Sequence, residues 1–570
     1  MTGTFRQLLC RSALCGALAV PMLAPRAALA GSGQDSATVR LIELLIKKGI
    51  LTKGQASSLL SQAEQEASTT HVARHAAKAA GAESPPVIPK GEVRVTYVPQ
   101  FVRDQIAREV QGQMLQKMEM NGWAAPDQTP EWVRRVRVYG DIRLRYQDNI
   151  QSQGNVASDG LPYPFPDFNA INASSGYDTS GTALPPLLNV SENRAFYQVR
   201  ARLGVHAQIS DYIGADIRVG TGNDNDPVSE NQTFGNPGDF SKYSIYLDRA
   251  YFDIKPVPGL ELLAGRTPKA YYLSTLMFAP DLAFDGVTAK YDFPLSDSVR
   301  AFVLGGAYPV FNESLNFSST ELVKGPSRNA YMFAAQGGAE WSINRDYFVK
   351  AAAGIFDFSN VAGKLSSPCF LFTTSDTCTT DDSRLPYYQF GNTMFGVRNI
   401  VVTNTTLQST PEYYGLSSQF DVLDLHGEVD MHNFDPIVVT LEGEYTKNLA
   451  FNRGYILARN PVNNFGSNND YQGGDTAYLL ALTVGYPETD HLWEWNLRGE
   501  YRYIASDAFI GSFTDQNFHL GGTDAKGYVL SGNLGIGPNT YVSARWSSAS
   551  VVSGPPDGND MLQIDLNTSF

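Results

Sequence analysis

The chain has 570 residues, a formal net charge of −14 and 11% aromatic residues. An acidic chain is a poor partner for nucleic acid, because the phosphate backbone is best met by basic surfaces. The mean hydropathy is only −0.22, and no apolar run after the first thirty residues approaches the roughly 20 residues of a membrane helix. A protein that crosses a membrane with short strands escapes this exclusion, since only every second residue must be apolar.

Residues 1–30 are predicted to be a secretory signal peptide. Two arginines precede an apolar stretch at 14–23, and Ala28-Leu29-Ala30 provides small residues at a cleavage position. A lipoprotein interpretation of Cys15 is weaker, because a bulky leucine precedes it where that processing prefers a small residue. The mature protein is therefore expected to be exported.

Residues 31–130 have a different character from the rest of the chain. Apolar residues recur at helical spacing in 39–46 and again in 99–120, with an Ala-rich and Pro-rich linker between them. We predict a small periplasmic helical segment and linker. A coiled-coil-like oligomerisation segment is the second interpretation, and it is weaker because no heptad run is long enough to support it.

From Arg135 onward the apolar residues recur with a period of two. Val136, Val138, Ile142 and Leu144 share one face of the first such segment, while the other face is rich in arginine. With this first one, roughly sixteen segments of this kind are present, an even number as bacterial barrels require. Their approximate spans are 135–147, 195–209, 212–220, 245–254, 260–267, 284–292, 298–308, 330–343, 347–358, 420–432, 436–447, 475–486, 493–504, 526–537, 539–548 and 560–570.

The connections between these segments alternate between short and long. Ser210-Asp211 and 344–346 are tight, whereas 148–194 and 359–419 are long and rich in polar residues. A transmembrane barrel shows this alternation because its periplasmic turns are tight while its outer loops are free to grow. A soluble sandwich has no such reason to alternate. We therefore predict an all-β transmembrane barrel of about 16 antiparallel strands over residues 131–570.

The aromatic residues support a membrane barrel over a soluble β-sandwich. Several lie on the apolar face near predicted strand ends, as an interfacial girdle would require. These are Tyr146, Tyr197, Tyr212, Trp341, Tyr347, Trp493, Tyr503 and Trp546. The chain also ends on Phe570 after an amphipathic strand, which resembles the assembly signal that the outer-membrane barrel assembly machinery reads.

Five stretches of the chain are distinctive: LIELLIKKGILTKGQA (41–56), GEVRVTYVPQFVRDQI (91–106), NGWAAPDQTPEWVRRVRVYGDIRLRYQ (121–147), DRAYFDI (248–254) and GGTDAKGY (521–528). They resemble the putative porin family of proteobacterial outer membranes and, more distantly, the phosphate-selective porins. With the C-terminal strand they span nearly the whole mature chain. The resemblance implies a passive pore in the bacterial outer membrane, without fixing a solute.

The polar face of the predicted strands carries two patches of opposite charge. Neighbouring strands lie about 4.8 Å apart, so charges on the first three strands form one basic patch. We predict that both patches line the pore, as charges this crowded are tolerable in a wet lumen and would set up a field across it. An alternative is that they pair with charges on loops folded into the lumen. The predicted pore-lining residues are Arg137, Arg143, Arg145, Arg200, Arg202, Arg218, Asp424, Glu428, Glu442 and Glu444.

After the signal peptide the chain keeps two cysteines, Cys369 and Cys378. A close pair in an exported protein favours a loop disulfide, and the absence of a histidine partner at ligand spacing argues against zinc. Only seven histidines are present, and no set of them with serine and acid gives a convincing hydrolase centre. His426 and His432 lie on one strand face with acidic residues, where we favour a hydrated lumen wall. No catalytic residue, metal site or cofactor is predicted.

Two functions from different classes follow from these patterns. The first is a water-filled channel for passive diffusion of small hydrophilic solutes or ions; the second is a structural or adhesive surface barrel with a plugged lumen. A TonB-dependent receptor would need a globular plug and about 22 strands, more than this length holds. The expected partners are outer-membrane lipid, the assembly machinery and small hydrophilic solutes, with no nucleic acid. The sequence leaves a homotrimer open.

Overall fold

The computed structural model describes residues 135–570 except 182, 314–317, 320, 323–325 and 403–409. The predicted signal peptide at 1–30 and the predicted helical segment at 31–130 lie outside the described residues.

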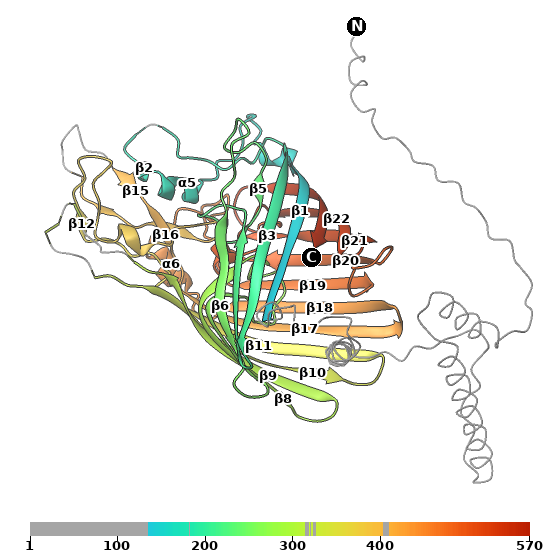
Figure 1. Cartoon of the computed structure of the whole chain (residues 1–570). Coiled ribbons are helices and arrows are strands. Elements are labelled where there is room, and N and C mark those ends of the chain that lie inside the picture. The colour runs from blue at the N-terminus through green and yellow to red at the C-terminus, as the bar shows by residue number, and fades with distance from the viewer. Residues whose placement is uncertain (1–134, 182, 314–317, 320, 323–325, 403–409) are drawn as a thin grey trace, which may run out of the picture. The chain divides into compact units, whose positions relative to one another are not determined.

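The described chain forms one closed antiparallel barrel (Figure 1). Its sheet includes a two-residue strand within a loop, β5 (Gln232–Thr233), beside 16 long strands that make the wall. The wall strands, in order, are β1 (Val136–Gln151), β3 (Arg194–Ser210), β4 (Ile213–Gly220), β6 (Tyr246–Ile254), β7 (Leu260–Pro268), β8 (Ala283–Pro294), β9 (Val299–Phe311), β10 (Ala330–Ser342), β11 (Tyr347–Ser359), β17 (Phe420–Phe434), β18 (Ile437–Asn448), β19 (Thr476–Gly485), β20 (Trp495–Ile504), β21 (Ala525–Gly537), β22 (Thr540–Val551) and β23 (Gly558–Ser569).

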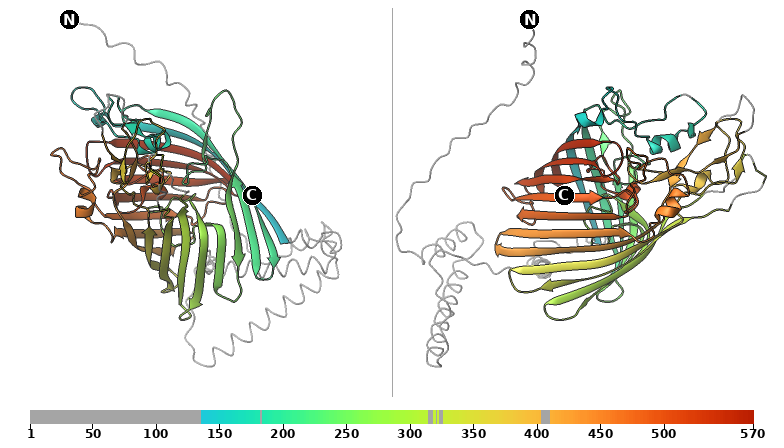
Figure 2. Two further views of the ribbon diagram at one scale, coloured as in Figure 1. Left: turned by 90° about the vertical axis from the view of Figure 1, so that its left-hand side faces the viewer. Right: turned by 180° about the vertical axis from the view of Figure 1, so that it is seen from behind.

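The barrel closes where the first strand meets the last. β1 pairs with β3 on one side and with β23 on the other, in a register that places Asp141 opposite Ser569. Phe570 completes this seam, because its backbone N–H donates to the Gly140 carbonyl at 3.0 Å and its carbonyl accepts from the Gly140 N–H at 3.1 Å. In Figures 1 and 2 the blue β1 therefore lies beside the red C-terminal strands. The predicted count of 16 strands is confirmed, and every predicted span overlaps one wall strand.

Alternation along each strand separates an outer apolar face from an inner face. On β1, Ile142 and Leu144 are 44% and 45% exposed on the outside, while Arg145, the next residue, is buried on the inside. Several predicted girdle residues, including Tyr197, Trp341 and Trp493, are likewise exposed large side chains. This arrangement is what a lipid-facing wall needs, since the hydrocarbon solvates apolar side chains.

The loops at the two ends of the barrel differ in length as predicted. Long loops gather at one end, where most of the short elements lie (Figure 1). These elements are η1 (Gln153–Asn155), α5 (Phe168–Ala173), β2 (Tyr177–Asp178), β12 (Pro368–Cys369), η2 (Asp381–Ser383), β13 (Met394–Gly396), β14 (Asn399–Ile400), β15 (Pro411–Glu412), β16 (Tyr414–Leu416), α6 (Arg453–Leu457) and η3 (Gly511–Phe513). Within the described part of the chain, no helix has the length and apolar character to cross a membrane.

Several of the long loops contribute to a hydrophobic core inside the barrel. Loop 269–282, between β7 and β8, buries Leu276, Met277 and Phe278 against inner side chains such as Phe356 of β11. Loop 505–524, between β20 and β21, buries Phe509 in the same cluster. Loop 360–419, between β11 and β17, adds further apolar side chains. Burial of this apolar surface stabilises the loops within the lumen.

This internal core corrects one expectation from the sequence. The inner face is not polar all round, because the loop ends of several strands turn apolar side chains inward. Phe356 and Phe358 of β11, Val422 of β17 and Leu479 of β19 are all buried in the core. On the other side of the barrel, the inner side chains Arg143 of β1 and Arg200 and Arg202 of β3 keep part of their surface accessible.

Candidate pore-lining site

The wall formed by β1 and β3 places three arginines side by side on the inner face. The strand register sets Arg143 directly opposite Arg200, with Arg202 two residues further along β3. Asp141 of β1 lies between them: its carboxylate accepts from Arg200 Nη2 at 2.9 Å and from Arg202 Nε at 2.7 Å. We call Arg143, Arg200 and Arg202 the arginine cluster.

A second carboxylate reaches the arginine cluster from loop 269–282. Asp281 lies 3.0 Å from Arg200, 3.3 Å from Arg202 and 3.9 Å from Arg143. Burial alone would raise the pKa of Asp281, but the three guanidinium groups outweigh it and hold that pKa below its usual range. The arginine side chains keep 12–14% of their surface exposed, so the cluster is both paired and accessible.

Two other predicted pore arginines are less accessible. Arg145 is buried and forms a bidentate pair with Asp565 of β23, with both N–O distances at 2.7 Å, and it donates to Asn517 of loop 505–524. Arg218 of β4 is buried against Asp248 and Glu230. Arg145 therefore joins β1 to β23 and to loop 505–524. Arg218 joins β4 to β6 and to loop 221–245. Arg137 is exposed, opposite His206 near the short-turn end.

Glu230, in loop 221–245, is a further carboxylate in contact with the arginine cluster. It lies 3.1 Å from Arg202 and 3.3 Å from Arg218. Burial, together with the neighbouring carboxylates Asp248 and Asp281, outweighs these arginines and raises the pKa of Glu230 to about 8.

The acidic patch on β17 and β18 is mostly enclosed. Asp424 and Glu444 are 0% and 3% exposed, which departs from the expected hydrated wall. Glu444 accepts a hydrogen bond from the Ser274 backbone N–H of loop 269–282 at 2.7 Å. Glu442 pairs with Arg498 of β20 at 2.6 Å and with the imidazole of His426 at 3.0 Å. Glu428 stands opposite Glu442 in the strand register.

Tyr272 shows how loop 269–282 crosses to the far wall. Its backbone N–H donates to Gln336 of β10 at 2.8 Å. Its ring lies 4.3 Å from Lys350 Nζ and 4.4 Å from the His426 ring. Together with the pair between Asp281 and Arg200, these contacts span the lumen from β3 to β17. The loop therefore narrows the barrel.

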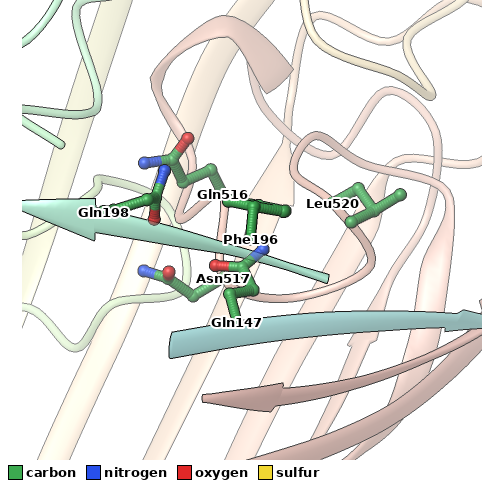
Figure 3. Close-up of a pocket in the computed structure, with 6 residues that line it drawn as sticks. All are labelled: Gln147, Phe196, Gln198, Gln516, Asn517 and Leu520. Atoms are coloured by element: carbon green, nitrogen blue, oxygen red, sulfur yellow. The ribbon is translucent and has the colours of Figure 1, made fainter. Parts of the chain in front are cut away.

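A partly open pocket of about 120 Å³ lies beside the arginine cluster, between loop 505–524 and the wall (Figure 3). Gln147 of β1 and Gln198 of β3 come from the wall. The loop contributes Gln516 and Asn517 on the facing side. Phe196 and Leu520 complete the lining.

The comparison with protein families decides the identity of the chain. The model of the family described as putative porin matches residues 35–570. The chain belongs to the putative porin family. This porin is an outer-membrane β-barrel channel, in agreement with the sequence prediction.

Solved structures with the same kind of barrel are only distantly similar to this porin. The outer membrane channel DcaP of Acinetobacter baumannii is 10% identical with a TM-score of 0.34, over 76% of this chain and 97% of that chain. OprB of Pseudomonas putida is 8% identical with a TM-score of 0.39, over 77% and 95%. OmpF of Salmonella typhi, in complex with daunomycin, is 10% identical with a TM-score of 0.34, over 76% and 97%. A search of the curated proteins returns no significant match.

Cys369 and Cys378 of this porin are joined by a disulfide within loop 360–419. Both sulfurs are buried in a small apolar cluster with Leu371. Among the described residues, no group of three histidine, cysteine, aspartate or glutamate side chains is arranged to hold a metal ion.

Sequence reasoning missed the loop residues that complete the site, above all Asp281, Tyr272 and Asn517. One signal could have found the first two. Loop 269–282 contains the apolar run Leu276-Met277-Phe278-Ala279, whereas the other long connections are mostly polar. An apolar run in a loop predicts burial, and in a barrel the available place is the lumen.

Proposed function

We propose that this porin is a passive channel whose diffusion path runs along the β1–β3 wall and past the arginine cluster. The observation that carries the proposal is the contrast between two parts of the lumen. Inner side chains of β11, β17 and β19 are packed into the loop core, whereas Arg143, Arg200 and Arg202 keep part of their surface accessible. Fixed charges beside a narrow aqueous path act on every passing ion.

A plugged structural barrel is the second candidate function. The internal core favours it, because several long loops are packed into the lumen. The two candidates differ in one measurable property, since only an open path conducts ions. Purified protein in planar bilayers should give stable ohmic steps if the path is open. A folded protein without conductance would support the plugged barrel.

Cysteine scanning locates the path within the lumen. Gln198→Cys places a thiol on the proposed path, and a charged methanethiosulfonate reagent should reduce its current. Val199→Cys, the next residue of β3, is the matched control because alternation turns it to the other face. Ala481→Cys is a second control within the internal core. Loss of current from the core thiol but not from Gln198→Cys would place the path elsewhere.

Assembly state and anion class are further proposals. We propose that the chain is a homotrimer inserted by the barrel assembly machinery, and that phosphate is among the anions it passes, following the distant similarity to phosphate-selective porins. The arginine cluster supports anion passage, because guanidinium groups bind oxyanions well. Native mass measurement in detergent tests the trimer. Reversal potentials in phosphate against chloride test the anion class.

A further inference from the structure

We infer that the pocket beside loop 505–524 is a binding subsite for neutral sugars on their way through the channel. This inference rests on the proposed function, because the pocket matters for transport only if solutes pass it. The positions of two of its lining residues on the wall strands support that role. Gln147 is two residues from Arg145 on β1, and Gln198 is two residues from Arg200 on β3, each toward the loop end of the barrel. A solute entering from the loops would meet the pocket before the arginine cluster.

The lining of the pocket is polar but uncharged. Its polar side chains are primary amides from Gln147, Gln198, Gln516 and Asn517 (Figure 3). An amide offers both donors and acceptors, which is the pattern that hydroxyl groups require. A carboxylate or phosphate solute would favour guanidinium or ammonium groups instead. Of the guanidinium groups on the same two strands, Arg145 is already bound by Asp565 and Asn517, and Arg194 lies against the Phe196 ring.

The amides divide into a fixed set and an available set. Asn517 is held by Arg145 at 2.7 Å and by Gln563 at 2.7 Å. Gln147 donates to Asn149 at 2.9 Å and accepts from Gln563 at 2.9 Å. By contrast, within the described part of the chain the Gln198 side chain makes one long hydrogen bond, to Thr233 at 3.3 Å. Hydrogen-bond capacity therefore remains for a solute.

Gln516 is the most available group of the pocket. Its amide has no hydrogen bond to any other described residue, and it belongs to loop 505–524, opposite the β3 wall. An amide with unused donors and acceptors at a partly open pocket is solvated in the empty channel. A hydroxylated solute can replace that water with little loss.

Two apolar side chains determine the shape of solute that fits. Phe196 offers an aromatic ring, and Leu520 is 42% exposed although it lies within the barrel. A sugar ring has one face of C–H groups and an edge of hydroxyls, so its face can contact Phe196 and Leu520 while its edge meets the amides. Arg194, whose guanidinium lies 4.7 Å from the Phe196 ring centroid, adds further exposed donors at the outer side. Amides together with two apolar side chains therefore fit the edge and the face of a neutral sugar ring better than they fit a small ion.

Sugar-induced reduction of ionic current tests the inference directly. Wild-type protein in planar bilayers should show a saturable fall in conductance as maltose is added, and Phe196→Ala should raise the half-blocking concentration about threefold to tenfold. Gln516→Leu keeps the side-chain size and should weaken the block similarly. Phe293→Ala, on the outer face of β8, is the matched control and should leave the block unchanged.

The possible outcomes distinguish failure of the proposed subsite from failure of the proposed channel function. Absence of any conductance would overturn the proposed function. Normal conductance with no saturable effect of maltose beyond that of glycerol at equal viscosity would overturn the subsite alone. The subsite would also be overturned if glucuronate blocked far better than glucose, since the pocket would then serve anions. An unchanged block in both Phe196→Ala and Gln516→Leu would place the sugar elsewhere.

Discussion

Arg200 of β3 and Asp281 of loop 269–282 lie 3.0 Å apart, Nη1 to Oδ1, inside the barrel. This contact joins the wall to the loop that narrows the lumen. The same aspartate also lies 3.9 Å from Arg143 and 3.3 Å from Arg202, so one loop residue reduces the net positive charge that all three arginines present to a passing ion. Removing the charge of Arg200 and removing the charge of Asp281 should therefore change ion selectivity in opposite directions.

Neutralising the arginine cluster should shift permeability toward cations. In Arg143→Gln/Arg200→Gln, the loss of two positive charges removes roughly 2 kcal/mol of attraction for an anion a few ångströms away in water, or up to about thirtyfold in the permeability ratio. Arg145 is left unchanged, because its loss would strand the buried carboxylate of Asp565. Reversal potentials in a low-salt gradient measure the effect. Arg137→Gln, near the short-turn end, is the control, and an equal shift in it would contradict a dominant role for the cluster.

Asp281→Asn should have the opposite effect. Removal of this negative charge leaves the three arginines with one carboxylate partner fewer, so the protein should become more anion-selective, by about fivefold for the single charge lost. The asparagine keeps the size of the side chain and much of its hydrogen bonding, so heat resistance of the barrel on gels should change little. A shift toward cations, or no shift with conductance intact, would show that Asp281 does not set the charge of the path.

Glu230 should make selectivity depend on pH. Its pKa of about 8 means that the carboxyl is mostly neutral at pH 6 and negative at pH 9. The channel should therefore become more cation-selective as pH rises through about 8. Glu230→Gln should flatten this response between pH 6 and 9, which reversal potentials at each pH would show. Because the folded pKa is raised above the usual value, the associated stability is present at low pH and lost as pH rises toward 8.

The disulfide between Cys369 and Cys378 should be present in protein taken from the outer membrane. It closes a short loop, so the stabilisation from the cross-link is about 3 kcal/mol at most. Both cysteines are buried, so a thiol reagent should be applied to denatured protein. Without reductant no label should enter, and with reductant two thiols should react. Labelling of both residues before reduction would contradict the bond.

Deletion of Phe570 should impair assembly of the barrel. Its backbone makes two hydrogen bonds to Gly140 at the seam, and its exposed ring extends the apolar outer surface. A charged residue at this position should be as damaging as the deletion, whereas Phe570→Tyr should be tolerated. The measurement is the yield of heat-modifiable protein in the outer-membrane fraction. Normal yield of the deletion at high expression would refute an assembly role.

The sequence alone determined the wall of this protein. Alternation with a period of two marks the strands because lipid contacts one face and the lumen the other, and this periodicity located the strands of Arg143 and Arg200 as well as the final strand before Phe570. The alternation of short turns and long loops likewise indicated which strand ends lie at which end of the barrel. Both signals are local, so neighbouring residues suffice to reveal them.

Only the tertiary structure decided how the lumen is filled. Asp281 and Arg200 are 81 residues apart in sequence, and nothing local predicts their contact. The same holds for Glu444, which meets the backbone of Ser274 from a strand on the far wall. The sequence pattern of charged residues on the inner face of a strand is the same whether water or a loop covers those side chains. The sequence therefore determined which side chains point inward, and loop packing decided which of them a solute can reach.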